Sequence, residues 1–323
     1  MSISESLNYL RACNQTPGLA LITNCSKGSN KVYCSGHLSA KDESENECIT
    51  AATRFQVASL SKFITACLVH ELKHRGCLQI NENARLKCGD ALISCAIHDL
   101  LSNRGGFTAG SRGFEGTEPK PNHTQETSET IERLCTNSYT PSLAGVYKYS
   151  GCNYWFLQKW LETKFDMPFE NLLQDWICSP LGLKNTTSQA PSRGDSVAIG
   201  HDAAGKPLQT GWKEFKELEA AAGIWSSAED MRELMRILLS VRSNSSLDVP
   251  KVRLEDLLQN GADGYHHGIM LKRALCGYKL FHSGINPGYY SYMAINLEYR
   301  KSQILLSNKE NGEALRKSII TIK

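Results

Sequence analysis

Short apolar runs rich in β-branched and aromatic residues lie near both ends of the chain. Residues 19–23 and 31–34 are separated by Lys27-Gly28-Ser29-Asn30, which is the composition of a β-hairpin. The pattern predicts that strands from the two ends share one sheet, with the middle of the chain beside it. The later runs of this kind are 278–281, 290–295 and 303–306.

Helical periodicity follows the first strands. Apolar residues recur at the spacing of one helical face, and Gly76 is placed to end that helix, so Ser59 stands at its start. Ser226 or Ser227 caps a second predicted helix, with Glu229 and Asp230 in its first turn. A short helix near 313–320 is predicted last. The inward-facing residues are Leu60, Phe63, Ile64, Cys67, Leu68 and Leu72 in the first helix and Met231, Leu234, Met235 and Leu238 in the second.

The middle of the chain, from about Cys95 to His201, has a mostly helical pattern. A polar stretch with glycine and proline from Arg104 to Thr130 interrupts it and predicts a long surface loop. We therefore expect two lobes. Residues 1–95 together with 202–323 form a discontinuous sheet lobe, and residues 96–201 form an inserted helical lobe.

Composition limits the classes of function. The 323 residues are 41% hydrophobic and carry a formal charge of +3, with no basic run that could follow a phosphate backbone, so nucleic acid is not an expected partner. No run of about 18 apolar residues predicts a membrane span. The amino-terminal residues lack the pattern of an export signal. The expected location is the cytoplasm, or the periplasm or exterior if a signal has been removed.

Twelve cysteines are spread along the chain without any Cys-x-x-Cys pair. In a chain of this length the spacing favours free thiols in a reducing compartment over a disulfide framework. Cys67 is expected in the core, on the apolar face of the first helix. Cys152 lies beside a motif described below.

The sequence Ser59-Leu60-Ser61-Lys62 offers a nucleophile and a base on one turn of helix. Residues three apart share a helical face, so the Lys62 amine can reach the Ser59 hydroxyl. Partial desolvation lowers the pKa of a lysine and lets it accept a proton. The helix amino terminus also favours negative charge that develops on an attacked carbonyl.

The run Phe55-Gln56-Val57-Ala58-Ser59-Leu60-Ser61-Lys62-Phe63 closely resembles the nucleophile segment of the class C β-lactamase and penicillin-binding-protein-like serine hydrolases. Further matches follow in the order that this family requires. The resemblance implies an α+β fold of the β-lactamase/transpeptidase type, with an antiparallel sheet flanked by helices and an inserted helical lobe. The matching segments are 97–106, Tyr147-Lys148-Tyr149-Ser150-Gly151, 179–183, 221–230 and His282-Ser283-Gly284.

Roles for single residues follow from this resemblance. Tyr149 would relay a proton to the leaving group and later activate water, with its pKa lowered by Lys62. The backbone N–H groups of Ser59 and Ile285, the latter directly after Gly284, would form the oxyanion hole. His282 would supply hydrogen bonds or positive charge near a substrate carboxylate.

One position departs from the family pattern. Many relatives have asparagine at the third position of the tyrosine motif, where its side chain binds the substrate amide, but this chain has Gly151. Asn153 is displaced by two positions and is not expected to point the same way. Efficient β-lactam hydrolysis is therefore in doubt, whereas acyl transfer is not.

A competing pattern is His70-Glu71-Leu72-Lys73-His74, which on a helix can bind zinc through two imidazoles. Lys73 would hold a cation close to the metal, so we do not expect a metal site. The main prediction is a serine hydrolase without a cofactor that cleaves a small-molecule ester or amide, such as a β-lactam, a D-amino-acid peptide or a small ester. A penicillin-recognising protein without turnover and a zinc peptidase are the alternatives, and the oligomeric state is open.

Overall fold

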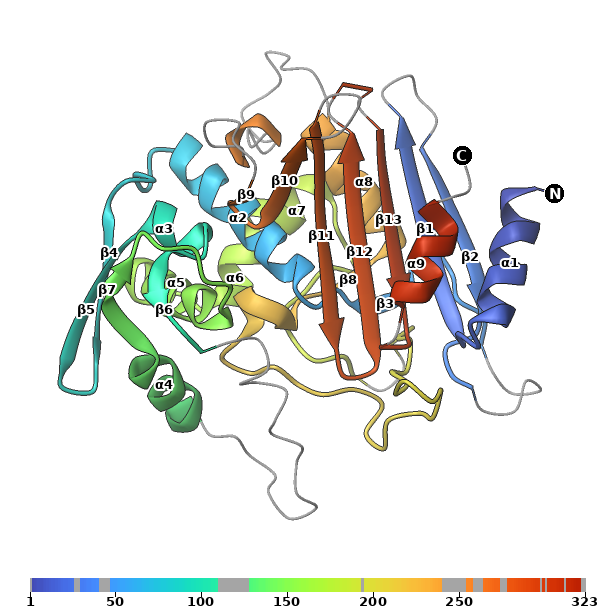
Figure 1. Cartoon of the computed structure of the whole chain (residues 1–323), viewed down its shortest axis with the longest axis horizontal. Helices are drawn as coiled ribbons and strands as arrows, with labels where there is room; N and C mark the ends of the chain where they lie inside the picture. Colours follow the sequence, from blue (N-terminus) through green and yellow to red (C-terminus); the bar gives the residue numbers. More distant parts are fainter. Residues whose placement is uncertain are drawn as a thin grey trace.

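A seven-stranded antiparallel sheet dominates the computed structural model, with strand order β2-β1-β13-β12-β11-β10-β9 (Figure 1). The pairing of β1 with β13 joins the two ends of the chain, with Leu19 opposite Ser307. The sheet predicted from the two ends is therefore confirmed. Its strands are β1 (Gly18–Cys25), β2 (Lys31–Gly36), β9 (Gly264–His266), β10 (Ile269–Arg273), β11 (Tyr278–Asn286), β12 (Tyr289–Asn296) and β13 (Lys301–Ser307).

The structure describes most of the chain in eleven ranges, and everything stated below concerns them. The described residues are 2–25, 30–40, 47–109, 128–192, 195–239, 254–257, 264–273, 278–296, 298–299, 301–310 and 312–320.

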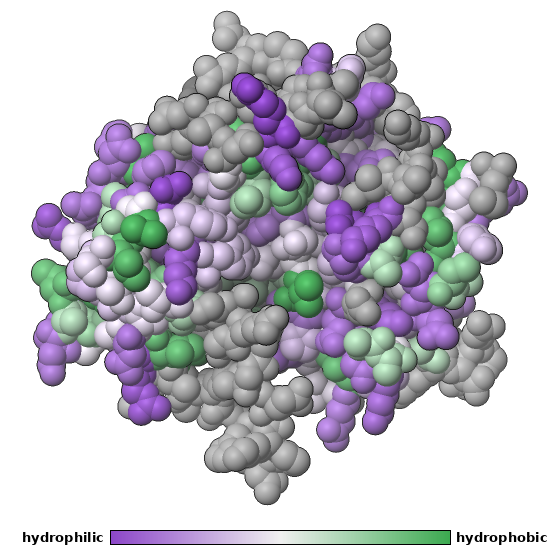
Figure 2. All heavy atoms as spheres, in the orientation of Figure 1, coloured by the Kyte–Doolittle hydropathy of each residue, from purple (hydrophilic) through white to green (hydrophobic). Residues whose placement is uncertain are grey.

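The terminal helices α1 (Ile3–Cys13) and α9 (Glu313–Ile320) cover one face of the sheet, with α9 in front of it in Figure 1. Alternate strand residues point toward them, because successive side chains in a strand face opposite sides. Seen from this side, hydrophobic residues are scattered among hydrophilic ones (Figure 2). The buried cluster under these helices is Leu7, Leu19, Leu21, Tyr290, Tyr292, Leu305 and Leu315.

The other face of the sheet packs on α8 (Ala228–Leu239) and α2 (Leu60–His74). Every residue of α2 from Leu60 to Leu72 is buried, so this helix is the centre of the molecule and not a surface element. Both helices fall where the apolar periodicity predicted them, and Gly76 follows α2 with a left-handed φ of 76°. The central position of α2 explains why its polar residues need partners from several neighbouring segments.

Most of the remaining elements lie beside α2, on the left of Figure 1, whereas the strand pair Arg54–Gln56 and Trp225–Ser227 lies behind the large sheet. The remaining elements are mostly helical, as predicted for the middle of the chain, with three small two-stranded sheets among them. The helices are α3 (Ile97–Leu101), α4 (Ser128–Asn137), α5 (Gly151–Phe165), α6 (Phe169–Leu173) and α7 (Ser179–Leu181), and the paired strands are β3 (Arg54–Gln56) with β8 (Trp225–Ser227), β4 (Asn83–Cys88) with β5 (Ala91–Ala96), and β6 (Gly105–Phe107) with β7 (Tyr139–Ala144).

Helix α1 and the β4–β5 hairpin are absent from the sequence predictions. The central part of the predicted surface loop, 110–127, and the hairpin turn at Lys27 to Ser29 lie outside the described residues. One continuous buried cluster runs from the sheet to α5 and α6, and the division into two lobes at residues 95 and 202 stays a prediction.

The described helices are all too short or too polar to span a bilayer. Ten cysteines in the structure are free, and Cys67 is buried as predicted.

Leu306 on β13 is fully buried between the sheet and its inner helices. We predict that Leu306→Ala lowers the free energy of unfolding by about 2–5 kcal/mol, because the cavity is only partly refilled. Leu92→Ala, at a position that is 72% exposed, is the matched control and should change it by less than about 0.5 kcal/mol. Urea denaturation measures both. Equal effects at the two positions would contradict the described core.

Candidate active site

Ser59 stands at the amino terminus of α2 with its side chain partly exposed. The preceding Ala58 has a left-handed φ of 49°, which costs a non-glycine residue about 1–2 kcal/mol and turns the chain sharply from β3 into the helix. The Ser59 side chain makes no capping hydrogen bond to the helix. The Ser59 hydroxyl therefore does not fill the helix-capping role that serine usually has at this position.

Lys62 lies one turn further along α2 and is 2% exposed. Its Nζ is 3.4 Å from Ser59 Oγ and donates to the Ala221 carbonyl at 2.7 Å. Burial lowers the pKa of Lys62 to about 7, and the neighbouring Cys152 opposes this shift. Because the charged amine is desolvated, a large fraction of Lys62 is neutral near pH 7 and able to accept a proton.

Tyr149 faces the same pair from the segment before α5. Its ring centre is 5.0 Å from Lys62 Nζ. Burial raises the pKa of Tyr149 to about 12, and a hydrogen bond with the Ser59 side chain only partly offsets this effect. The expectation that Lys62 lowers the pKa of Tyr149 is wrong in direction, because desolvation of the phenolate outweighs the attraction of a lysine that is itself partly neutral.

His282 is 5% exposed, on β11 behind Tyr149. Its Nε2 is 3.4 Å from the Tyr149 hydroxyl, so the neutral ring can accept a hydrogen bond from the phenol. Burial and the nearby Lys62 lower the pKa of His282 to about 3. The expectation that His282 supplies positive charge near a substrate carboxylate is therefore wrong at neutral pH.

Gly284 brings β11 against the backbone of the nucleophile. A Cβ at this position would lie 2.7 Å from the Ser59 nitrogen and 2.5 Å from Ser291 Oγ, so only glycine permits this approach. On one side, β10 pairs with β11 from Tyr278 to Phe281. On the other side, β12 pairs with β11 as far as Asn286. Among the described strands, the part of β11 with His282, Gly284 and Ile285 has no neighbour on the β10 side and forms an edge there. Ile285 is 58% exposed.

A π-helical turn, η4 (Glu219–Gly223), holds the amine of Lys62 in place. Ser61 and Thr65 of α2 bind this turn through Ile224 N–H at 3.0 Å and the Ala220 carbonyl at 3.0 Å. Asn286 of β11 donates to the Ala222 carbonyl at 3.0 Å. Sequence analysis matched this segment to the family but missed its contact with the lysine, which depends on tertiary packing.

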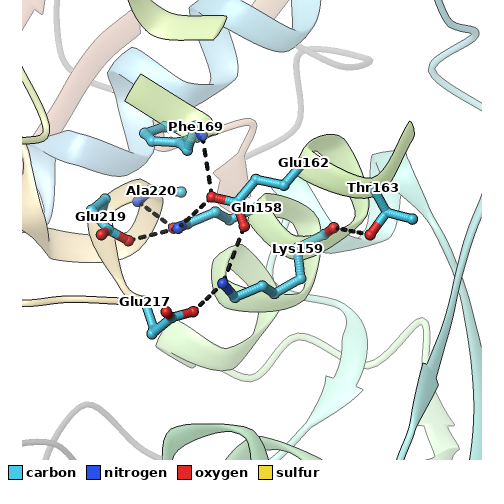
Figure 3. Close-up of polar contacts among 8 residues, drawn as sticks. All are labelled: Gln158, Lys159, Glu162, Thr163, Phe169, Glu217, Glu219 and Ala220. Carbon is cyan, nitrogen blue, oxygen red and sulfur yellow. Dashed lines mark hydrogen bonds and ion pairs between the residues drawn. The ribbon is translucent and has the colours of Figure 1, made fainter. Parts of the chain in front are cut away.

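Polar side chains of α5 fix the same turn from the other side (Figure 3). Gln158 donates to Glu219 at 2.6 Å and accepts from the Ala220 N–H at 3.0 Å. Lys159 forms ion pairs with Glu162 and Glu217. The Ala221 carbonyl, which accepts the hydrogen bond from Lys62 Nζ, is therefore held between two helices.

Asn103 and Asn153 fix the segment that carries Tyr149. Asn103 accepts from the Ser150 N–H at 3.0 Å and from Asn153 at 3.3 Å, while Asn153 accepts from the Gly105 N–H at 3.1 Å. Asn153 is fully buried. It therefore has a structural role, in agreement with the expectation that it does not replace the asparagine absent at Gly151.

The His-Glu-x-x-His residues diverge in the structure. His70 contacts His267 at 2.7 Å, His74 contacts Asp256 at 2.9 Å, and Glu71 pairs with Arg75 at 2.7 Å. No group of three metal-binding side chains occurs among the described residues. The structure gives the zinc alternative no support.

The antiparallel sheet with a serine–lysine pair on the central helix is the β-lactamase/transpeptidase-like fold. A family model described as Beta-lactamase matches residues 8–321, and the chain belongs to this family. A β-lactamase of Pseudomonas fluorescens is 27% identical over 224 residues, or 68% of this chain and 57% of the relative. The chain thus matches a little over half of that relative's length.

Solved structures with low identity share the fold. The class C β-lactamase of Rhodobacter sphaeroides has a TM-score of 0.75 at 18% identity, covering 98% of this chain and 97% of its own. A β-lactamase/D-alanine carboxypeptidase of Pseudomonas syringae has a TM-score of 0.76 at 14% identity, covering 98% and 95%. An octameric penicillin-binding protein homologue of Pyrococcus abyssi has 0.77 at 17%, covering 99% and 76%.

Gly284→Ala tests the contact between β11 and the nucleophile. The new Cβ would collide with Ser291 and with the Ser59 backbone, so we predict a fall in kcat/KM for p-nitrophenyl acetate of about tenfold or more. Lys279→Ala, on the same strand, is the control and should retain activity. A fully active Gly284→Ala variant would show that this approach is not needed.

Proposed function

We propose that the protein is a serine hydrolase that cleaves an ester or amide through an acyl-Ser59 intermediate. The observation that carries the proposal is a serine hydroxyl 3.4 Å from a buried lysine whose pKa is lowered to about 7. Acyl transfer through a covalent intermediate requires a nucleophile and a base that can remove its proton. Membership of the β-lactamase family supports the same class of reaction.

In the acylation step, neutral Lys62 removes the Ser59 proton while Oγ bonds to the substrate carbonyl carbon. The carbonyl electron pair moves onto its oxygen, which the N–H groups of Ser59 and Ile285 stabilise. When the bond to the leaving group breaks, Tyr149 gives that group a proton and regains one from the Lys62 ammonium. The raised pKa of Tyr149 supports the role of a neutral proton donor.

Deacylation uses the same groups in reverse. Water loses a proton to Lys62 as its oxygen attacks the acyl carbon, and the tetrahedral intermediate releases Ser59. The proton returns from Lys62 to Ser59 Oγ, and the acid product leaves. Tyr149 would carry the proton across the gap, with His282 accepting the hydrogen bond from its hydroxyl at 3.4 Å.

We propose a narrower set of substrates for this protein than the family as a whole accepts. Gly151 cannot bind a substrate amide through a side chain, and a buried neutral His282 offers no charge to a carboxylate. Small esters and amides without a required carboxylate are the favoured substrates, ahead of β-lactams and D-amino-acid peptides. We further propose that the protein acts in a reducing compartment such as the cytoplasm, which the free thiols support.

A recognition protein without turnover is the second candidate. Its support is the raised pKa of Tyr149, which makes a phenolate base for water activation rare at neutral pH. Labelling with a fluorescent penicillin or a fluorophosphonate, followed by mass spectrometry, separates the two. A stable penicillin adduct on Ser59 without any ester turnover would favour the recognition protein.

Ser59→Ala is the direct test of the proposed nucleophile. We predict that hydrolysis of p-nitrophenyl acetate falls by about 10³-fold or more while the thermal unfolding midpoint stays close to that of the wild type. Ser61→Ala is unsuitable as a control because Ser61 accepts from the Ile224 N–H at the end of η4, so Ser94→Ala, at an exposed position on β5, serves instead. Unchanged hydrolysis in Ser59→Ala would refute the assignment.

The pH dependence tests the proposed base. Since Lys62 must be neutral to accept a proton and its pKa is about 7, we predict that kcat/KM rises with pH around a midpoint near 7 and then levels. Stopped-flow hydrolysis between pH 5 and 9 measures this limb. A midpoint near 10 would mean that Lys62 is an ordinary charged lysine and not the base.

A further inference from the structure

Three histidines from separate elements form a continuous chain through the protein beside the candidate active site. His267, in the turn between β9 and β10, uses both ring nitrogens: Nδ1 is 2.7 Å from His70 Nε2, and Nε2 is 2.9 Å from His98 Nδ1. His70 belongs to α2 and His98 to α3. His70 and His267 are 1% and 0% exposed, whereas His98 is partly exposed.

The unpartnered nitrogen at the inner end sets the direction of the chain. His70 Nδ1 is buried and has no hydrogen-bond partner among the described residues. A buried N–H without an acceptor is more costly than a lone pair without a donor. The protons therefore point outward, from His70 Nε2 to His267 Nδ1 and from His267 Nε2 to His98 Nδ1, with the last N–H at the partly exposed ring.

The rings are held neutral by their surroundings. Burial lowers the pKa of His70 to about 4, holds that of His267 well below its ordinary value, and also lowers the pKa of His98. The charged and titratable groups that act on them are Asp256, Lys73, His74 and His266 from the α2 and β9 side and Asp99 and Arg104 from the α3 side. Both hydrogen bonds need neutral His267 and His98 rings, because each of these rings accepts at an unprotonated Nδ1.

The turn that His267 fixes touches the candidate catalytic residues on its other side. A Cβ on Gly268 would lie 2.6 Å from the Lys62 carbonyl oxygen and 2.7 Å from Phe63 Cα, so this turn packs directly on the backbone of Lys62. Tyr265 of the same hairpin makes edge contacts with the rings of Tyr149 and His282, with centroids 5.7 and 5.6 Å apart. One hairpin thus packs on the backbone of Lys62 and on the side chains of Tyr149 and His282.

We propose that His267 is a positioning residue for the acyl-transfer reaction: its two imidazole contacts clamp the β9–β10 turn between α2 and α3 and so hold Tyr265 and Gly268 against Tyr149, His282 and Lys62. This proposal rests on the proposed function for its kinetic consequence. His267 touches none of the reacting atoms and acts through the hairpin. Loosening the turn would admit water beside Lys62 and let Tyr149 shift.

His267→Leu tests the proposal, because leucine keeps apolar bulk but makes neither contact. His266→Leu is the matched control in the same hairpin. Rates are taken per active site, counted by fluorophosphonate labelling of Ser59. For His267→Leu with p-nitrophenyl acetate we expect kcat to fall about tenfold or more with KM changed less than about twofold, since positioning errors act on the chemical step.

The pH profile separates positioning from a merely structural role. In His267→Leu the acidic limb of kcat/KM should move to higher pH by about one unit or more, because a better-hydrated Lys62 regains part of its ordinary pKa. His266→Leu should leave the limb in place. An unchanged limb and kcat per active site in His267→Leu would overturn the proposal, even if the variant unfolds at lower temperature.

A second measurement does not depend on activity. In the wild type, ¹H–¹⁵N spectra should show two imidazole N–H protons protected from exchange and shifted far downfield by the short contacts. Their absence would overturn the proposal. If both resonances are present but the wild type does not hydrolyse p-nitrophenyl acetate, the result would instead count against the proposed function. If His267→Leu does not fold, His98→Gln at the outer end must show the same shift of the pH limb, and its failure to do so is equally decisive.

Discussion

The burial of one amine organises this protein. Lys62 lies on a helix whose residues are buried from Leu60 to Leu72. Within the described part of the chain, its Nζ has one serine hydroxyl and one backbone carbonyl at hydrogen-bonding distance. Burial dominates the shift in the pKa of Lys62, and the opposing influence comes from the Cys152 thiol. These surroundings stabilise the charged amine less than water does, so the neutral form of Lys62 is populated near neutral pH.

Keeping a lysine in this state requires several segments far apart in the sequence. The η4 turn supplies the carbonyl, α5 fixes η4 through Gln158, and the β9–β10 turn seals the backbone side at Gly268. Strand β11 then brings Gly284 against Ser59. Burial of an ionisable group lowers the stability of the folded protein. The arrangement around Lys62 is therefore better explained by the function of the site than by folding.

Local patterns predicted most of the fold, because the sheet strands and the helices α2 and α8 have strong period-two or helical apolar spacing. Helix α1 carries a capping box, in which Glu5 N–H donates to Ser2 Oγ and Ser2 N–H to the Glu5 carboxylate, and that Ser-x-x-Glu signal was present in the sequence. Strand β4 alternates polar and apolar residues as Asn83-Ala84-Arg85-Leu86-Lys87-Cys88, so its period-two signal was also present in the sequence, whereas β5 alternates less regularly. The left-handed Ala58 and the π-helical η4 depend on tertiary packing, which no local pattern contains.

The candidate site divides in the same way. The motifs predicted that Ser59, Lys62 and Tyr149 come together, but the sign of the Tyr149 pKa shift and the neutrality of His282 follow from burial, which spacing does not report. The most direct test is an NMR titration of ¹³Cε-labelled lysine, with Lys62→Arg used to assign the resonance. The account predicts a Lys62 pKa of about 7. A resonance that titrates near the ordinary lysine value of about 10.4 would contradict it.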